Sequence, residues 1–320
     1  MTKNEQLRYR IIRGPCLGLV PFPENGAVTT LDVDSTSAIF CQVGIDGSFE
    51  AEHLETLKRL GKKRPLVMLA FPPKAAGTFL RSAIIYAIDG EIVRVVHAQG
   101  GRDAQPYLPT FINYFNGGLT DGPLVAHVHM LALPANLHFL EAFGIRPIIM
   151  KRSIPDMLAS YWDMIESDAV ALKDGLNCHI PENFPLLPDA AKADFLIDIL
   201  APWYVNYYAG WLRYAETNPD AICVLDYRDF LDDPAGTLSQ ALDHVHLPRT
   251  PAECMTAINL AWSRRSEFRF NKGEEGRGGH YFEAAHLARL TRLLGHYPSL
   301  APHAEELLDT GLEWQATVNE

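Results

Sequence analysis

From residue 64 onward, short apolar runs alternate with longer stretches in which apolar residues recur every three to four positions. The first apolar run, residues 65–71, contains no polar residue and ends at two prolines, a pattern typical of a strand buried on both faces. Similar short runs occupy residues 92–96, 124–128, 147–150 and 221–225. Helical patterns occupy residues 78–88, 134–143, 155–167, 197–217, 234–244, 283–294 and 302–308. This alternation predicts an α/β fold with a central, mostly parallel β-sheet flanked by helices.

The first 63 residues follow a less regular pattern than the rest. Two β-like runs, residues 27–33 and 37–43, precede a predicted helix around residues 50–60. We therefore predict an N-terminal extension over residues 1–63 and one main domain over residues 64–320. Three roles stay open for the extension: an edge hairpin, a cover over a substrate, or a contact between the subunits of a homodimer.

The segment after the first apolar run is suited to hold an anion. Residues 73–80 read Pro-Lys-Ala-Ala-Gly-Thr-Phe-Leu and join the predicted strand to a predicted helix. Small residues let backbone N–H groups converge on a phosphate or sulfate at a helix N-terminus, while Lys74 adds a charge and Thr78 a hydroxyl. The order differs from the GxxxxGK[ST] of nucleoside-triphosphate loops, because the lysine precedes Gly77. A plain turn with a solvated lysine is the alternative.

A second anion-binding pattern follows the run at residues 147–150. Arg152 stands directly after that predicted strand, and Ser160 follows eight residues later in a predicted helix. The guanidinium fork of arginine matches phosphate geometry, so both side chains are candidates for the same anion. The alternative is an arginine that caps a surface helix, with a serine facing solvent.

At these two places the chain resembles the PAPS-dependent sulfotransferase superfamily (cytosolic and bacterial type). The family's 5′-phosphosulfate loop reads Pro-Lys-Ser-Gly-Thr-Thr-Trp-Leu, or Pro-Lys-Thr-Ala-Gly-Thr-Ser-Leu in other branches, and aligns without a gap. Lys74 and Thr78 fall on the family's lysine and final threonine, and Phe79 falls on the tryptophan that stacks on adenine. Ala76 replaces a glycine and Gly77 a threonine. Arg152, Ser160 and Tyr161 reproduce the family's 3′-phosphate motif.

Two further segments extend the resemblance, which covers residues 65 to about 290. The glycine-rich segment 271–279 resembles the family's late Arg-Lys-Gly-x-x-Gly loop through Lys272 and Gly273, while Asn271 takes the arginine position. Arg269 and Arg277 are candidates for the missing charge. Residues 224–234 resemble the family's Tyr-Glu-Asp segment, which would place Tyr227 near the nucleotide.

The resemblance implies a P-loop-like sulfotransferase fold that binds 3′-phosphoadenosine 5′-phosphosulfate (PAPS). The implied nucleotide-binding residues share the two motifs and the two later segments: Lys74, Ala75, Ala76, Gly77, Thr78, Phe79, Arg152, Ser160, Tyr227, Lys272 and Gly273. Transfer of the sulfuryl group to a hydroxyl needs a base, and histidine serves near neutral pH. His127 and His129 are the candidates; counting back from Leu133 and Pro134 aligns His127 with the family's base. Lys74 would stabilise the leaving group.

Composition narrows the possible partners. The formal net charge of −11 and pI of about 5.5 argue against a nucleic acid or a polyanionic polysaccharide and favour a small-molecule, lipid or polyketide-like acceptor. Five scattered cysteines predict neither a disulfide framework nor a metal site. The polar first residues and the absence of a long apolar run predict a cytoplasmic protein without a membrane span.

Two other functions remain open at this stage. One is an ATP-dependent small-molecule kinase of related fold, which the missing GK[ST] order disfavours. The other is a catalytically silent nucleotide-binding module, which a histidine at the base position disfavours.

Overall fold

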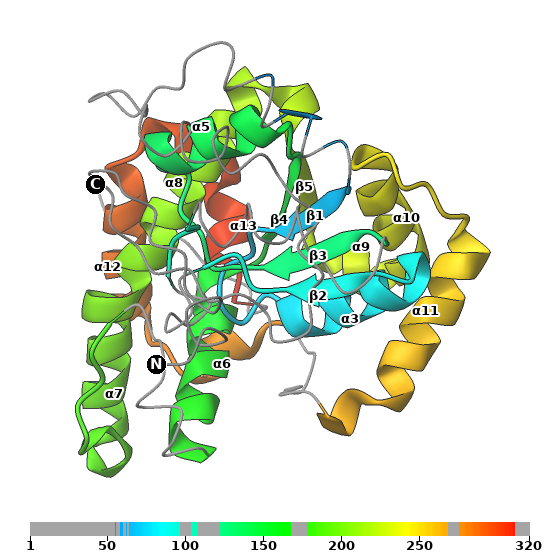
Figure 1. Ribbon diagram of the computed structural model, residues 1–320. Helices are drawn as coiled ribbons and strands as arrows, with labels where there is room; N and C mark the ends of the chain where they lie inside the picture. The colour runs from blue at the N-terminus through cyan, green and yellow to red at the C-terminus, as the bar shows by residue number, and fades with distance from the viewer. Residues whose placement is uncertain are drawn as a thin grey trace, which may run out of the picture.

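Five parallel strands, in the spatial order β2-β3-β1-β4-β5, form the centre of the fold (Figure 1). The computed structural model describes residues 55, 58–59, 62, 64–96, 104–107, 122–167, 178–267 and 275–310. Each strand arises from one of the predicted apolar runs. Their bounds are β1 Leu66–Leu69, β2 Glu91–Val93, β3 Leu124–His127, β4 Pro147–Lys151 and β5 Cys223–Asp226. The predicted α/β fold with a parallel sheet is therefore confirmed.

The central strand explains the continuous apolar run that opens the main domain. Leu66 to Leu69 are all buried, because β1 pairs with β3 on one side and β4 on the other while helices cover both faces. Leu69 lies opposite His127 in the register with β3. The carboxyl ends of these three neighbouring strands consequently meet at one edge of the sheet.

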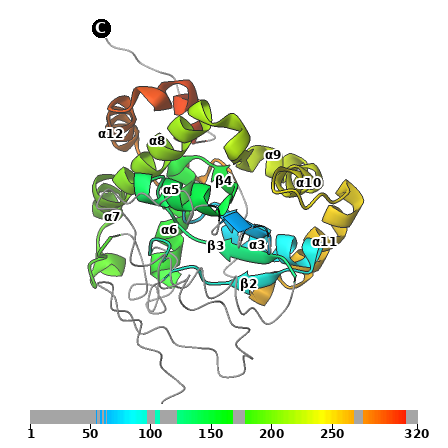
Figure 2. The same ribbon diagram turned by 45° about the horizontal axis from the view of Figure 1, so that its top comes forward.

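Helices cover the sheet in two layers. In both ribbon views α3, α10 and α11 lie on one side, and α5, α6, α8 and α12 lie on the other (Figures 1 and 2). The helices are α3 Gly77–Ile88, α5 Pro134–Phe143, α6 Ile154–Ser167, α7 Asp189–Phe195, α8 Ala201–Thr217, α9 Tyr227–Asp232, α10 Pro234–His244, α11 Pro251–Ser263, α12 Ala284–Gly295 and α13 Ala304–Leu308. Short helical turns are η1 Phe184–Leu186, η2 Leu196–Leu200, η3 Pro219–Ala221, η4 Arg265–Glu267, η5 Arg277–His280 and η6 Pro298–His303.

Most of the helix predictions agree with the structure. The helix predicted over residues 302–308 is α-helical only from Ala304, because the 3₁₀ turn η6 extends to His303. The helix predicted from residue 197 begins earlier, since α7 runs through the π-helical turn η2 into α8. The sequence interpretation also missed α11, although its start is well marked. Thr250 and Glu253 form a reciprocal capping box there, with Pro251 in the first turn.

Some predictions lie outside the described residues. These are the two β-like runs at residues 27–33 and 37–43 and most of the helix around residues 50–60. The boundary between extension and main domain stays a prediction. In the part of the chain that the structure describes, every helix is too short or too polar to cross a membrane.

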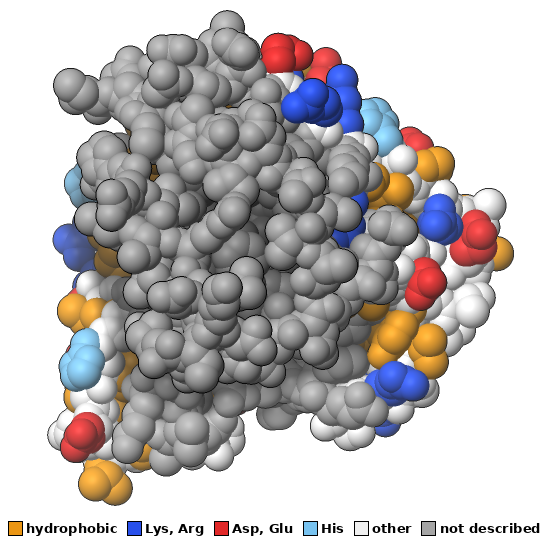
Figure 3. All heavy atoms as spheres, viewed as in Figure 1, with side chains coloured by type: hydrophobic (Ala, Val, Ile, Leu, Met, Phe, Trp, Pro, Cys, Tyr) orange, Lys and Arg blue, Asp and Glu red, His pale blue; other side chains and the backbone are white. Residues whose placement is uncertain are grey.

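The surface carries charges of both signs. Over the helices on the right of Figure 3, acidic and basic side chains stand close together among hydrophobic ones. Such interspersed charges are ordinary for a protein surface.

Candidate functional site

The carboxyl edge of the sheet brings the two predicted anion-binding segments together. The loop after β1 carries Lys74, β4 leads into Arg152, and β3 ends at His127. Arg152 reaches across to the loop, where its Nη1 atom donates a hydrogen bond to the main-chain carbonyl of Lys74 at 2.7 Å. Ligands of open parallel sheets bind outside this edge. The two motifs, distant in sequence, thus form one site.

The loop after β1 holds an unusual backbone without glycine. Lys74 and Ala76 have φ angles of 65° and 58°, in the left-handed region that residues with a Cβ atom rarely adopt. Ala76 is also the N-cap of α3 and supplies no side-chain capping bond. A helix N-terminus without a side-chain cap at its N-cap residue has backbone N–H groups that can bind an anion. Ala75, between these two residues, is fully buried.

The position of Gly77 has no room for a side chain, because the ring of His127 at the end of β3 lies against it. A Cβ atom at Gly77 would lie 2.4 Å from both Cε1 and Nε2 of the His127 ring. Glycine at this position thus leaves room for the ring against the loop after β1. His127 is buried, while His129 is partly exposed, and their ring centroids lie 5.2 Å apart. Both candidate bases are consequently at the same edge, with His127 nearer to the loop backbone.

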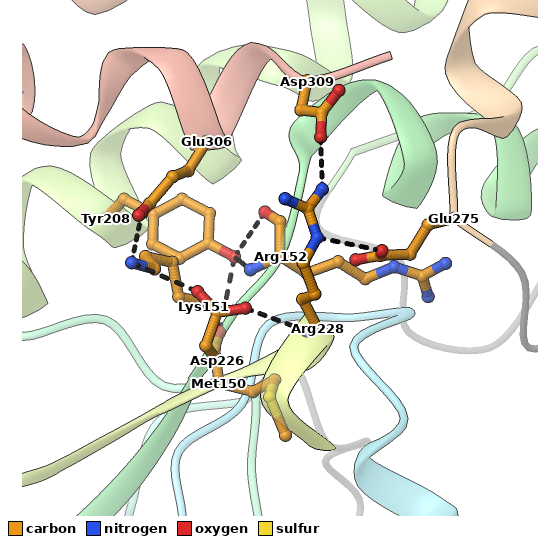
Figure 4. A network of polar contacts seen from close by, with 9 residues as sticks. All are labelled: Met150, Lys151, Arg152, Tyr208, Asp226, Arg228, Glu275, Glu306 and Asp309. Carbon is orange, nitrogen blue, oxygen red and sulfur yellow. Dashed lines mark hydrogen bonds and ion pairs between the residues drawn. The ribbon is translucent and has the colours of Figure 1, made fainter. Parts of the chain in front are cut away.

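Arg152 is fixed on several sides (Figure 4). Its main-chain N–H donates to the hydroxyl of Tyr208 at 2.9 Å, and that hydroxyl donates to the Arg152 carbonyl at 3.0 Å. Its guanidinium carbon lies 4.0 Å from the ring centroid of Tyr227, a cation–π contact. Tyr227 thus supports the arginine. Ser160 lies on the buried face of α6, the helix that follows β4.

A network of ion pairs surrounds this strand end (Figure 4). Lys151 pairs with Asp226 at 3.2 Å and with Glu306. Arg228 bonds to Glu275 at 3.2 Å and to Asp309 at 2.5 Å. Residues 304–310 are thereby tied to the ends of β4 and β5. Lys151 and Arg228 bind carboxylates, whereas Arg152 reaches the loop after β1 through its bond to the Lys74 carbonyl.

The glycine-rich segment near the C-terminus is docked on α6 by a buried carboxylate. Asp156 is only 2% exposed and accepts hydrogen bonds from the N–H groups of Gly276 at 2.9 Å and Gly278 at 2.8 Å. A Cβ atom at Gly278 would lie 2.4 Å from the Cβ of Pro155, so only glycine fits there. The sequence interpretation missed this role of Asp156, which looked like an ordinary acidic residue in a first helical turn.

Arg277 faces the same helix. Its Nη2 atom pairs with Asp163, which also accepts a hydrogen bond from the Tyr281 hydroxyl at 2.6 Å. This pairing argues against Arg277 as the substitute for the family's arginine. Lys272 and Gly273 lie outside the described residues, as does Arg269, so their assignment to the nucleotide stays a prediction.

Asp156 offers a pH test of this docking. Burial raises the pKa of its carboxyl, against the opposing effects of the Gly278 N–H group and Arg152. An acid whose pKa is higher in the folded protein binds more protons when folded, so the free energy of unfolding falls as pH rises through that interval. We expect Asp156 to contribute a fall in the free energy of unfolding as pH rises above about 4, and Asp156→Asn to lack that contribution. Urea unfolding across that pH range measures the difference.

The control for this experiment is Asp220→Asn, which changes an exposed carboxylate. Its pH dependence of stability should match that of the wild type. An unchanged slope in Asp156→Asn would remove the buried carboxyl from this role.

An aromatic cluster lies between the first turn of α3 and α11. The Phe79 ring makes edge contacts with Phe230 and Trp262, both at 6.1 Å between centroids. Trp262 is 47% exposed, and the Arg265 guanidinium lies 4.9 Å from its ring centroid. An exposed tryptophan beside Phe79 offers a flat face for a planar ligand. The sequence interpretation missed Trp262 because it missed α11.

The aromatic residues of α8 belong to the core. The structure buries Tyr204, Tyr207, Tyr208 and Trp211 completely. Their polar atoms bond to main-chain carbonyls at the site edge; for example, Trp211 Nε1 donates to Met130 at 2.8 Å. These buried side chains therefore fix main-chain groups at the carboxyl edge of the sheet.

The comparisons with known proteins agree with this architecture. No protein-family model and no curated protein match the sequence. The crystal structure of mouse sulfotransferase SULT7A1 complexed with PAP is similar, with a TM-score of 0.57 and 12% identity over 81% of this chain and 93% of that chain. A retinol dehydratase in complex with androsterone and inactive cofactor PAP gives a TM-score of 0.46 at 12% identity, over 92% and 99% of the chains, too loose a likeness for an argument. The chain thus has the sulfotransferase fold, as its motifs predicted.

Proposed function

We propose that this protein is a PAPS-dependent O-sulfotransferase. The observation that carries the proposal is the hydrogen bond from Arg152 to the Lys74 carbonyl, which joins a lysine-bearing anion loop to an arginine at the next strand end. A nucleotide with phosphate groups at both its 5′ and 3′ positions needs two such anion sites in one place. Mouse SULT7A1, which shares the fold, is complexed with PAP.

The two sites divide the nucleotide between them. Lys74, Thr78 and the backbone of residues 75–77 would bind the 5′-phosphosulfate at the N-terminus of α3. Arg152 and Ser160 would bind the 3′-phosphate, with Lys272 and Gly273 completing the enclosure. Phe79 and Trp262 would contact the adenine, one by its ring face and the other by its edge, since their rings lie at 79° to each other.

His127 would act as the general base for the acceptor hydroxyl. It takes the proton as the acceptor oxygen forms its bond to sulfur, while the bond from sulfur to the 5′-phosphate oxygen breaks and leaves its electron pair on that oxygen. Lys74 would neutralise the charge that develops there, which is the usual role of a fixed cation in group transfer. A monoanionic sulfuryl group makes less demand on a metal than a triphosphate does.

The acceptor that best suits an acidic protein is a neutral small molecule, such as a lipid or polyketide-like alcohol or phenol. A sulfated polysaccharide would meet repulsion from a chain with a net charge of −11.

Thermal unfolding with a panel of nucleotides tests the proposal. PAPS and its desulfated product should raise the melting temperature, because a ligand that binds only the folded protein stabilises it. ATP with magnesium and NADPH should have little effect. Sulfated product from a panel of alcohols and phenols would establish turnover. Stabilisation by ATP alone would favour a kinase, and tight nucleotide binding without any product would favour a silent module.

Gly77 provides a test of the base. We expect Gly77→Ala to lower the rate of sulfuryl transfer about a hundredfold, since its methyl group would push the His127 ring away and a reacting group misplaced by about 1 Å has an effect of that order. Steady-state kinetics with PAPS measures it. Gly295→Ala is the matched control, because a Cβ atom there meets nothing within 4 Å. Normal turnover in Gly77→Ala would show that the position of His127 is unimportant.

A further inference from the structure

One face of α8 holds both anion-binding segments. The Tyr204 hydroxyl donates a hydrogen bond to the Pro73 carbonyl at 3.0 Å. One helical turn later, the Tyr208 hydroxyl accepts from the Arg152 N–H at 2.9 Å and donates to the Arg152 carbonyl at 3.0 Å (Figure 4). Met150 offers a longer alternative acceptor at 3.4 Å. Residues four apart lie on the same side of a helix, so a single rigid element fixes the loop after β1 and the end of β4.

These contacts close into a ring through the site. Tyr204 holds the carbonyl of Pro73, the peptide group that precedes Lys74. Arg152 holds the carbonyl of Lys74 itself, the peptide group that follows, and Tyr208 holds Arg152. The left-handed φ of 65° at Lys74 is unfavourable for a residue with a side chain, and such conformations persist where the surroundings fix them on several sides. The ring provides that fixation.

We propose that Tyr204 and Tyr208 are positioning residues, of which Tyr204 sets the place of Lys74 and Tyr208 sets the place of Arg152. The inference rests on the proposed function, because it assigns one tyrosine to each phosphate of the nucleotide. Both side chains are completely buried, so they act through the residues they hold. Burial also raises the pKa of the Tyr208 hydroxyl, which keeps its proton available for the Arg152 carbonyl.

The two tyrosines should leave different signatures in nucleotide binding. Tyr208→Phe deprives two buried main-chain groups of Arg152 of their partner, which should lower the preference for adenosine 3′,5′-bisphosphate over adenosine 5′-monophosphate about tenfold. Tyr204→Phe disturbs the loop that binds the 5′ group common to both ligands. It should weaken both about equally, by about tenfold, and leave the preference unchanged. Isothermal titration calorimetry with the two nucleotides measures both quantities.

Tyr214→Phe is the matched control. Tyr214 lies on the same helix, its ring is nearly buried, and within the described residues its hydroxyl makes no hydrogen bond. Both affinities should match those of the wild type. Thermal unfolding of each variant without ligand separates loss of fold from loss of position.

If a folded Tyr208→Phe protein shows the wild-type preference for the bisphosphate, whether or not both affinities fall, the assignment of that tyrosine is overturned. If Tyr208→Phe does not fold, Tyr204→Phe decides: a loss confined to the bisphosphate, or no loss, overturns the positioning role. Wild-type protein that binds neither nucleotide would overturn the proposed function as well. Wild-type binding with the wrong tyrosine signatures would overturn this inference alone.

Discussion

Lys74→Ala is expected to lower the rate of sulfuryl transfer at least about a hundredfold, the scale for removal of a fixed electrostatic group from a reacting centre. The reason is the charge that develops on the bridging oxygen when the sulfur–oxygen bond breaks. Lys74 stands in the anion loop, with its main-chain carbonyl bound by Arg152. Single-turnover kinetics with enzyme-bound PAPS separates this effect from weaker nucleotide binding.

The control for Lys74 is Lys58→Ala, which removes an exposed lysine paired only with Glu55 among the described residues. Its rate should equal that of the wild type. Lys74→Arg should recover binding of the nucleotide better than it recovers the rate, because the guanidinium keeps the charge but places it differently. A single-turnover rate in Lys74→Ala within a few-fold of the wild type would exclude the lysine from leaving-group stabilisation.

His127→Ala is the second change from which a large effect is expected, at least about a hundredfold in rate, as for other lost general bases. The affinity for the desulfated nucleotide should change little, since the base acts on the acceptor. The rate of the wild type should rise with pH as histidine loses its proton, and this rise should disappear in the variant. A pH series of rates under saturating PAPS measures it.

His129→Ala and His138→Ala complete that experiment. His138 is exposed on α5 and should be without effect. His129 lies beside His127, with ring centroids 5.2 Å apart, so a moderate loss is expected from the disturbed packing. If His129→Ala instead abolishes the pH-dependent rise while His127→Ala retains it, the base is His129.

The sequence predicted the parts of this fold that depend on local pattern. Buried parallel strands favour short, mostly apolar runs, and each of the five strands overlaps one of the predicted runs. Lys74 and Arg152 could be found because Lys74 lies in the loop after a strand and Arg152 directly after another, and the carboxyl ends of parallel strands share one edge. The start of α11 could also have been found, since Thr250, Pro251 and Glu253 form a recognisable helix start.

The supporting contacts could not be predicted, because they join residues that are far apart in sequence and ordinary in type. Nothing local distinguishes Asp156, which binds Gly276 and Gly278, from an acidic residue in any first helical turn. The tyrosines of α8 have the spacing of a helix core, and only the fold shows which carbonyls their hydroxyls meet. Likewise, the contact of Gly77 with His127 depends on the register between β1 and β3.

The glycine-free turn at Lys74 and Ala76 also bears on the unfolded chain. Residues with a Cβ atom sample fewer backbone conformations than glycine does, so ordering them loses less conformational entropy. The native loop is therefore sterically strained, but less conformational entropy is lost when the loop becomes ordered. Less conformational entropy then has to be lost for this loop to be ordered before any anion binds.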